Sequence, residues 1–448
     1  MLGQHRLQEI AERALREATA DQTEVIVTGS NSLLTRFAAN TIHQNVSETD
    51  VSVRVRSIAD RKTGVASGNQ FEDNDLRKLV SSAETAARFQ QPNPEMPSLP
   101  APRPVEEIDA FKEPTASFTP MQRAEAVESI LRQSRDHGLE AAGAFSTEQQ
   151  EFMVANSLGV RAYHRGTVAH VVTVIMGSDS SGYASAAALD VSDIDAAAVG
   201  KVAVDKALQG RNPTEIEPGE YTVILEEEAV ADMLFMLGYI GFGALAFQEG
   251  RSFMTGKLGE KITGDNITIW DDGHDLRGLP VTFDFEGVPK EKVTLIENGV
   301  ARNVVYDTFT AGREEGKHST GHSLPAPNGM GPIPIHLFMA PGTATKEEML
   351  ASTERGIWVT RFHYTNPVHP VKSVLTGMTR DGTFLIEDGK ITRPLKNLRF
   401  TQSILEAFAH AEMLGRDLKM VKDDWNSLAT CAPAAKVRSF RFTGTTDF

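Results

Sequence analysis

Cysteine is almost absent from this chain: Cys431 is the single one in 448 residues. One thiol forms no internal disulfide and supplies no CxxC metal-binding pair. Cysteine this scarce is typical of a protein kept in a reducing compartment. Cys431 precedes Ala432 and Pro433 and has no histidine nearby in the sequence. This context favours a small buried apolar residue over a nucleophile or a metal ligand.

Basic residues are outnumbered by acidic ones, and long apolar runs are few. The 45 Lys and Arg are outnumbered by 60 Asp and Glu, which gives a formal net charge of −15. Such a chain repels phosphate backbones and anionic lipid, so we expect neither a nucleic acid nor a membrane as partner. The longest apolar run, from Met233 to Phe247, is shorter than the roughly 20 residues of a spanning helix. The first residues lack the apolar core of a signal peptide, and we expect a cytoplasmic protein.

Common catalytic motifs are missing too, including GxSxG, GxxxxGK[ST] and a GxGxxG that follows a strand. The only histidines at metal-ligand spacing are His318 and His322, but glycine and proline crowd their segment. No glutamate follows His318 as it would in HExxH. The composition therefore predicts a loop, formed by His318, Ser319, Thr320 and His322, that contacts a peptide or a partner chain. A metal site in this loop is the alternative.

Two further polar groups have structural explanations. The triplet Glu226-Glu227-Glu228 precedes the apolar run and predicts a solvated helix start, where carboxylates stabilise the helix dipole. His363 and His369 lie in an aromatic, proline-containing stretch, which predicts a packed turn between strands.

Proline, by contrast, is concentrated: seven of the 21 prolines lie between Pro92 and Pro114. This spacing excludes a helix or a central strand and favours an extended connection. The segments on either side resemble each other. Residues 3–20 and 120–137 predict amphipathic helices, the second with Thr119 as N-cap and Pro120 as first helical residue. Residues 76–89 and 194–208 predict closing helices.

Strand-like segments lie between these helices at matching positions. The pair Ala39-Asn40 recurs at 155–156, and a Gly-x-Ala-Ser motif begins at Gly64 and again at Gly182. The offsets, 155 − 39 = 116 and 182 − 64 = 118, are nearly constant. We interpret this as a duplicated unit of helix, antiparallel strands and helix.

Beyond about residue 212 the chain is rich in short β-like segments, at 221–225, 267–270, 281–285, 293–296 and 383–386. Asn298-Gly299 and Asp388-Gly389 predict two-residue hairpin turns, and helices are expected near 228–247 and 401–415. The sequence thus predicts an α+β protein in which the duplicated unit precedes a large β-rich C-terminal domain. We expect repeats at 1–91 and 119–212, a proline-rich connection at 92–118, and the C-terminal domain at 213–448.

The C-terminal half resembles the TldD/PmbA family of gyrase modulators and metallopeptidases. The resemblance rests on six motifs in the family's order: Gly250 to Lys261, Asp271-Asp272-Gly273, Asp284 to Pro289, Leu295 to Gly299, Ser319 to His322, and Gly377 to Gly382. The duplication and the proline-rich connection also fit, so the resemblance spans essentially the whole chain.

The resemblance implies two types of chain. In the TldD type, an HExxxH helix before the Gly-Arg-Ser-Phe segment holds zinc together with a later cysteine. Here that position has no histidine, because none occurs between His170 and His274, and Phe235, Met236 and Tyr239 lie in the segment that replaces the metal helix. The chain is therefore similar to the TldE/PmbA type, which carries no catalytic or metal residues of its own.

This similarity implies a non-catalytic subunit of a heteromeric zinc metallopeptidase that degrades or trims small unstructured peptides. Zinc is then expected in a TldD-type, HExxxH-bearing partner and not in this chain. Two alternatives stay open. One is a self-sufficient peptidase with an unrecognised site around His318, His322, His363 or Cys431. The other is a peptide-binding or scaffold homodimer with no enzymatic partner.

Overall fold

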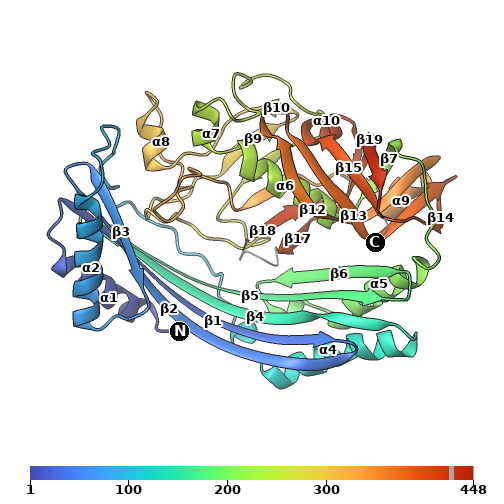
Figure 1. Ribbon diagram of the computed structural model, residues 1–448, viewed down its shortest axis with the longest axis horizontal. Helices are drawn as coiled ribbons and strands as arrows, with labels where there is room; N and C mark the ends of the chain where they lie inside the picture. The colour runs from blue at the N-terminus through green and yellow to red at the C-terminus, as the bar shows by residue number, and fades with distance from the viewer. Residues whose placement is uncertain (423–427, 447–448) are drawn as a thin grey trace.

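The computed structural model describes residues 1–422 and 428–446. These residues form three β-sheets with helices packed around them, which confirms the predicted α+β fold (Figure 1). No helix in the described part of the chain is long and apolar enough to span a membrane.

The N-terminal part forms one six-stranded antiparallel sheet in the order β3-β2-β1-β4-β5-β6, drawn as the long curved layer beneath the rest of the molecule in Figure 1. Its strands are β1 Gln22–Ala38, β2 Thr41–Ala59, β3 Lys62–Gly68, β4 Glu140–Asn156, β5 Arg161–Met176 and β6 Ser181–Ala188. The repeats join where β1 pairs with β4, from Glu24 opposite Asn156 to Phe37 opposite Gly143. Because β1 and β4 are equivalent first strands paired antiparallel, an approximate two-fold rotation relates the repeats.

Each repeat carries a first and a last helix: α1 Gln4–Glu17 and α2 Asp73–Arg88 in one, α4 Pro120–Asp136 and α5 Ala196–Gln209 in the other. The predicted cap of α4 is confirmed. The Thr119 hydroxyl accepts a hydrogen bond from the Gln122 backbone N–H at 3.3 Å, and the Gln122 side chain accepts one from the Thr119 N–H at 2.9 Å. This reciprocal pair satisfies two donors that the helix itself leaves free.

The repeated Gly-x-Ala-Ser motif has a packing cause. A Cβ placed on Gly64 would lie 2.0 Å from the Ala83 carbonyl oxygen of α2, and one on Gly182 would lie 2.1 Å from the Ala203 carbonyl oxygen of α5. Only glycine allows a helix to approach a strand this closely. The duplication is thus confirmed in its contacts as well as in its order of elements.

The proline-rich segment runs as an extended connection with one short helix, α3 Glu113–Ala116. Its backbone carbonyls serve as acceptors along the sheet: the Asn156 side chain donates to Pro100 at 2.8 Å, and the Thr167 N–H donates to Ala110 at 3.0 Å. Proline has no N–H to pair in a sheet, but its neighbours' carbonyls remain available. The connection is therefore fixed to the sheet by hydrogen bonds without extending it.

The C-terminal part contains two sheets. One follows the order β12-β7-β19-β15-β13-β14, with β16 on β19, and the extra pairing of β12 with β13 closes five of these strands into a ring. The other follows β10-β9-β8-β11-β18-β17. The strands are β7 Gly219–Leu225, β8 Ile269–Asp271, β9 Val293–Glu297, β10 Val300–Ala301, β11 Leu337–Met339, β12 Arg355–His369, β13 Val374–Glu387, β14 Lys390–Pro394, β15 Leu398–Ser403, β16 Ala411–Leu414, β17 Lys419–Lys422, β18 Ala429–Ala432 and β19 Ala435–Thr445.

The largest apolar core surrounds α6, which packs against β7 and β12 of the first C-terminal sheet and against β11, β17 and β18 of the second. The remaining helices and short 3₁₀ turns are α6 Glu227–Gly241, α7 Ala244–Gln248, α8 Thr308–Gly312, α9 Lys346–Ala351, α10 Ile404–Ala409, η1 Val191–Asp193 and η2 Pro370–Lys372. An apolar helix between two sheets explains the run from Met233 to Phe247 without a membrane.

Both predicted hairpin turns are confirmed: Asn298 and Gly299 have φ of 49° and 78°, and Asp388 and Gly389 have 49° and 73°. Three other predictions were wrong. Residues 281–285 make a single bridge, Phe283 with Pro289, and no strand. The helix expected at 401–415 is divided among β15, α10 and β16. The turn expected around His363 and His369 is a bulged stretch of β12, because β13 pairs along its whole length.

Candidate functional site

The outer face of α6 carries the residues expected to replace the metal helix. Phe235, Met236 and Tyr239 share this face with Asp232, while the positions between them are buried. Tyr239 is 52% exposed. A groove of about 180 Å³ runs along Asp232 and Phe235 and continues to Arg361 of β12. The face therefore offers one carboxylate and three side chains without a nitrogen that binds metals.

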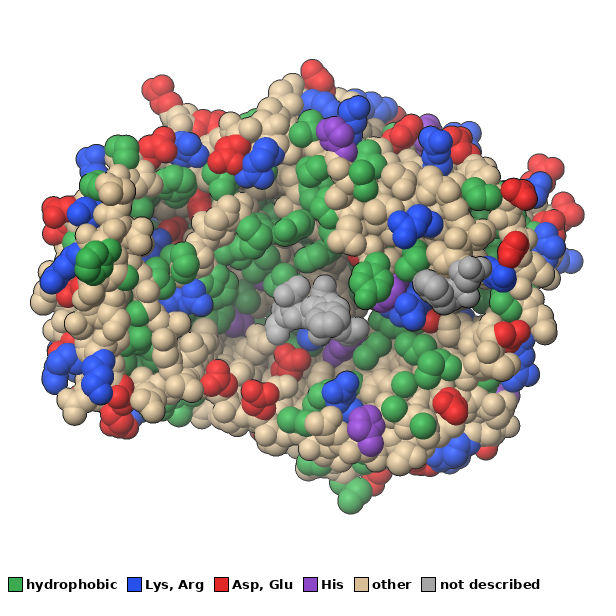
Figure 2. All heavy atoms as spheres, viewed as in Figure 1, with side chains coloured by type: hydrophobic (Ala, Val, Ile, Leu, Met, Phe, Trp, Pro, Cys, Tyr) green, Lys and Arg blue, Asp and Glu red, His purple; other side chains and the backbone are tan. Residues whose placement is uncertain are grey.

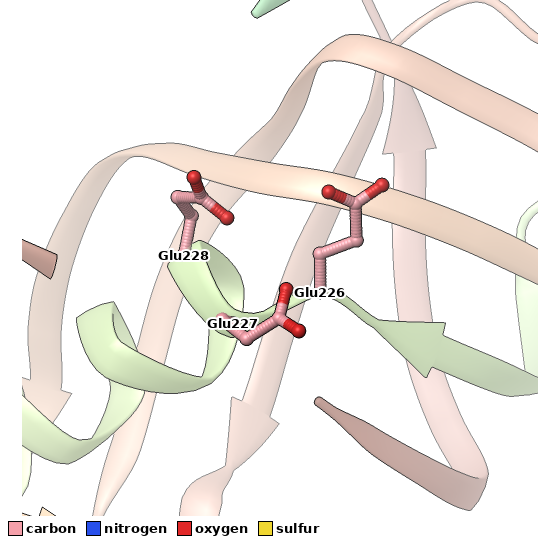
Figure 3. Close-up of side chains that lie close together, drawn as sticks. All are labelled: Glu226, Glu227 and Glu228. Carbon is pink, nitrogen blue, oxygen red and sulfur yellow. The ribbon is translucent and has the colours of Figure 1, made fainter. Parts of the chain in front are cut away.

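Figure 3 shows the three glutamates at the start of α6. They are buried, with 6–7% exposure each, so the predicted solvated helix start was wrong. Each of the three carboxylates forms an ion pair with a different lysine. Lys206 Nζ lies 2.7 Å from Glu226 Oε2, Lys346 Nζ lies 3.1 Å from Glu227 Oε1, and Lys419 Nζ lies 2.5 Å from Glu228 Oε1.

The lysines favour the charged form of Glu228. Burial would raise the pKa of Glu228, but Lys419 and Lys206 outweigh it, and the pKa lies below its usual range. The three carboxylates approach within 4.8 Å of one another, the one such close group of three potential metal ligands in the described part of the chain. Because each already faces an ammonium group, the triplet is an ion-pair network at the helix N-terminus.

The loop with His318 and His322 directs its two histidines to different partners. His318 is exposed and bonds Glu291 at 2.9 Å. His322 is fully buried, with Nε2 at 2.8 Å from Asp271 Oδ1 and Nδ1 at 2.9 Å from Thr320 Oγ1. Ser319 donates a hydrogen bond to the Tyr306 carbonyl at 3.4 Å. The predicted loop is confirmed as a loop, whereas its contact with a peptide or partner stays a prediction.

Asp271 is the centre of a buried polar group that the sequence did not reveal. Its Oδ2 accepts the His336 backbone N–H at 2.7 Å, and Lys290 Nζ lies 4.0 Å from its Oδ1. Burial would raise the pKa of Asp271, but His322 and Lys290 hold it well below its usual range. Burial, with Lys290 nearby, lowers the pKa of His336 to about 3, so this imidazole is neutral at physiological pH.

Lys290, His322 and His336 of this polar group line part of a cavity of about 580 Å³ between the N-terminal sheet and the C-terminal domain, and we call this part its polar end. Figure 2 shows the surface hollowed here, with hydrophobic side chains gathered in the hollow. The apolar wall residues include Phe152, Val168, Leu279, Phe283, Phe285 and Ile335. The Phe152 ring centre lies 4.9 Å from that of Phe283 and 5.5 Å from that of Phe285. An apolar pocket with a few convergent polar groups is the usual form of a ligand site.

A second buried network joins the N-terminal sheet to the C-terminal domain. Arg56 of β2 bonds Glu24 of β1 at 2.6 Å and Glu286 of the C-terminal domain at 3.3 Å. Burial raises the pKa of Glu24 to about 7, although Arg56 opposes it. Burial, together with the charge of Glu286, also raises the pKa of Asp284 to about 7. Two carboxyl groups with raised pKa values, those of Glu24 and Asp284, therefore lie where the two parts meet.

Cys431 lies in β18 among Trp270 and Phe338 and is 1% exposed, which confirms a small buried apolar residue. Burial raises the pKa of its thiol to about 12, so it is no thiolate at neutral pH.

The residues of these two polar networks differ in how far the sequence could reveal them. Asp271, Asp284 and Glu286 stand in segments that carry the family resemblance, and that was a usable signal. Lys290 and His336 stand in no motif. Only the fold brings them to the same carboxylate.

Comparison with known proteins shows which family this chain resembles. Residues 23–87, 110–211 and 218–444 match, in order, the family models for PmbA/TldA metallopeptidase domain 1, the central domain and the C-terminal domain. Metalloprotease PmbA of Escherichia coli O157:H7 is 24% identical over 92% of each chain. A metalloprotease TldD homolog of Haemophilus influenzae is 26% identical over 82% of this chain and 79% of its own.

The fold also matches a solved structure. TldE from Thermococcus kodakarensis superposes with a TM-score of 0.88 over 98% of this chain and 99% of its own, at 22% identity. The three domain models cover most of the sequence, and the chain belongs to the PmbA/TldD metallopeptidase family.

Proposed function

We propose that this chain is a non-catalytic TldE/PmbA-type subunit of a heteromeric zinc peptidase, with the zinc held by a TldD-type, HExxxH-bearing partner. The observation that carries the proposal is the outer face of α6, the helix before the Gly-Arg-Ser-Phe segment. It presents Asp232, Phe235, Met236 and Tyr239. A catalytic zinc needs three good protein ligands and an open position for water. One carboxylate on this face does not meet that need.

The neighbouring carboxylates do not fit the metal either. Glu226, Glu227 and Glu228 are each paired with a lysine, so a zinc ion would have to displace three ammonium groups from a buried site. Zinc sites in proteins are built mainly from histidine and cysteine with few carboxylates. The donor set therefore supports a chain that depends on a metal held elsewhere.

The substrates in this proposal are small unstructured peptides, met in the cytoplasm. The cavity and the groove along α6 both have Leu428 in their lining, so an extended peptide could follow one into the other. Their sizes suit a few residues of chain and exclude a folded domain. The chain would hold part of the peptide while the partner's metal activates the attacking water.

The proposal is tested by measuring the metal content and peptide cleavage of the purified chain, alone and mixed with a TldD-type partner. We expect less than a tenth of an equivalent of zinc in the chain alone, no cleavage alone, and cleavage in the mixture that a chelator abolishes. Stoichiometric zinc with cleavage by the chain alone would instead identify a self-sufficient peptidase. A stable homodimer that binds no HExxxH-bearing partner would identify a scaffold.

His322→Ala separates these outcomes further, because His322 is the buried member of the only histidine pair at metal-ligand spacing. In our proposal, the variant has the same metal content as the unmodified chain. A drop in bound zinc would contradict it.

A further inference from the structure

The polar end of the cavity has two buried groups with no hydrogen-bond partner among residues 1–422 and 428–446: Lys290 Nζ and His336 Nδ1. The Lys290 side chain is 2% exposed and that of His336 is 6% exposed. Both atoms flank one carboxylate oxygen, Asp271 Oδ1, at 4.0 Å and 3.9 Å. A buried polar atom without a partner costs free energy, so two at one place indicate a ligand group that satisfies both.

The neighbouring acceptors are already occupied. Asp271 Oδ1 accepts from His322 and Oδ2 from the His336 backbone. Asp284 Oδ1 accepts the N–H groups of Glu286 and Val288, and its Oδ2 accepts that of Ser323. The open hydrogen-bonding capacity is therefore that of donors: the Lys290 amino group and, as the Nδ1-protonated tautomer, the His336 imidazole. Burial lowers the pKa of Lys290, while the charges of Asp271 and Asp284 oppose this and favour the ammonium form. The missing group must supply acceptor oxygens.

The lining and the volume of the rest of the cavity indicate which kind of ligand fits. The Phe152, Phe283 and Phe285 rings form one wall, with Leu279 and Ile335 also lining the space. Apolar surface of this kind favours an apolar side chain. A volume of about 580 Å³ accommodates two or three residues of peptide.

We propose that this cavity binds the C-terminal end of a short peptide whose last residue is apolar, with the terminal carboxylate on Lys290 Nζ and His336 Nδ1. This inference rests on the proposed function, since it names the part of a peptide that this subunit holds. A carboxylate is favoured over an amide because its hydrogen bonds to an ammonium group are charge-assisted. The apolar side chain of the last residue then lies against the three phenylalanines.

The test measures binding of acetylated tripeptides to the chain alone by isothermal titration calorimetry. We expect acetyl-Ala-Ala-Leu with a free carboxylate to bind at least tenfold more tightly than its C-terminal amide. It should also bind at least tenfold more tightly than acetyl-Ala-Ala-Asp and than hexanoate, a free apolar acid without a peptide backbone. Equal binding of acid and amide, or of peptide and hexanoate, overturns the proposal. So does an absence of binding, since water then suffices for the two orphan donors.

Variants assign the effect to residues. Lys290→Met keeps an unbranched side chain one heavy atom shorter, removes the ammonium group and should abolish the preference for acid over amide. Lys292→Met is the matched control, because Lys292 is 55% exposed two residues away. It should keep the preference. Loss of the preference in both variants, or in neither, overturns the proposal.

A second variant tests the proposal even if Lys290→Met does not fold. Leu279 is half-buried in the wall, so Leu279→Trp should fill the space with little effect on the core. We expect at least tenfold weaker peptide binding at an unchanged melting temperature. Unchanged binding overturns the proposal. Failure here with intact partner-dependent cleavage leaves the proposed function standing, whereas failure of that function shows as an absence of cleavage in the mixture.

Discussion

Two places in this molecule hold distant segments together in different ways: glycines allow a helix to approach a strand closely in one, and buried charges form ion pairs in the other. Within the N-terminal sheet, α2 and α5 approach their strands at Gly64 and Gly182, where no side chain fits. Where that sheet meets the C-terminal domain, buried ion pairs such as Lys206 with Glu226 and Arg56 with Glu286 add to apolar contacts such as that of Phe152 with Phe283. The glycine contacts depend on shape, whereas the ion pairs depend on charge. Substitutions and pH should therefore affect the two places differently.

The largest expected effect is at the glycine contact of the second repeat. Gly182→Val should destabilise the protein by about 3 kcal/mol, because its Cβ would overlap the Ala203 carbonyl of α5 and force backbone to move. Urea unfolding followed by circular dichroism measures this. Gly68→Ala is the control, since its Cβ would meet Leu79 at an ordinary 3.7 Å. Similar losses in the two variants would show that close approach is not the cause.

Next in size is the charge contact between α5 and α6. Lys206→Met should cost about 2 kcal/mol by leaving Glu226 buried without its cation. The double variant with Glu226→Gln should recover part of this loss in the same unfolding assay. Lys201→Met on the same helix, whose pair with Asp205 is exposed, should cost less than about 0.5 kcal/mol. An equal loss in the two single variants would contradict the role of burial.

The pH dependence of the free energy of unfolding tests the role of the buried carboxyl group of Glu24. Its pKa of about 7 in the folded chain lies above the ordinary 4.5, so folding binds a proton. The stability from this group is complete below pH 4.5 and is lost as the pH rises to 7, by about 1 kcal/mol per unit. The unmodified chain should therefore lose stability relative to Glu24→Gln over this window. Parallel profiles would contradict this, and Glu48→Gln on the exposed part of β2 is the control.

The smallest effect is expected at the start of α4. Thr119→Ala should cost about 1 kcal/mol by removing the reciprocal cap with Gln122. Thermal unfolding measures it, with the exposed Ser117→Ala as control. Because this cap acts within one helix, its effect should not change between pH 5 and 7, in contrast to that of Glu24. A pH-dependent effect would show that the two regions are more strongly coupled than their contacts indicate.

Local patterns predicted much of the fold. The amphipathic helices, the cap at Thr119 and both Asn-Gly and Asp-Gly turns depend on neighbours within a few residues. The strand predicted at 281–285 was wrong, because the apolar residues of this segment line the cavity and do not pair in a sheet. The solvated helix start predicted for the glutamate triplet was wrong because its partners are distant in the sequence. The three lysines come from positions 206, 346 and 419, and no local pattern shows that they meet the glutamates.

By itself the sequence determined the α+β class, the duplication and the absence of histidine from the helix that precedes the Gly-Arg-Ser-Phe segment. These follow from composition and periodicity, which act over short distances along the chain. Only the tertiary structure decided that the repeats share one sheet, that three glutamates are buried against three lysines, and that Lys290 and His336 meet at Asp271. The reason is physical: burial and charge pairing depend on which distant segments come into contact, and packing of the whole fold decides that.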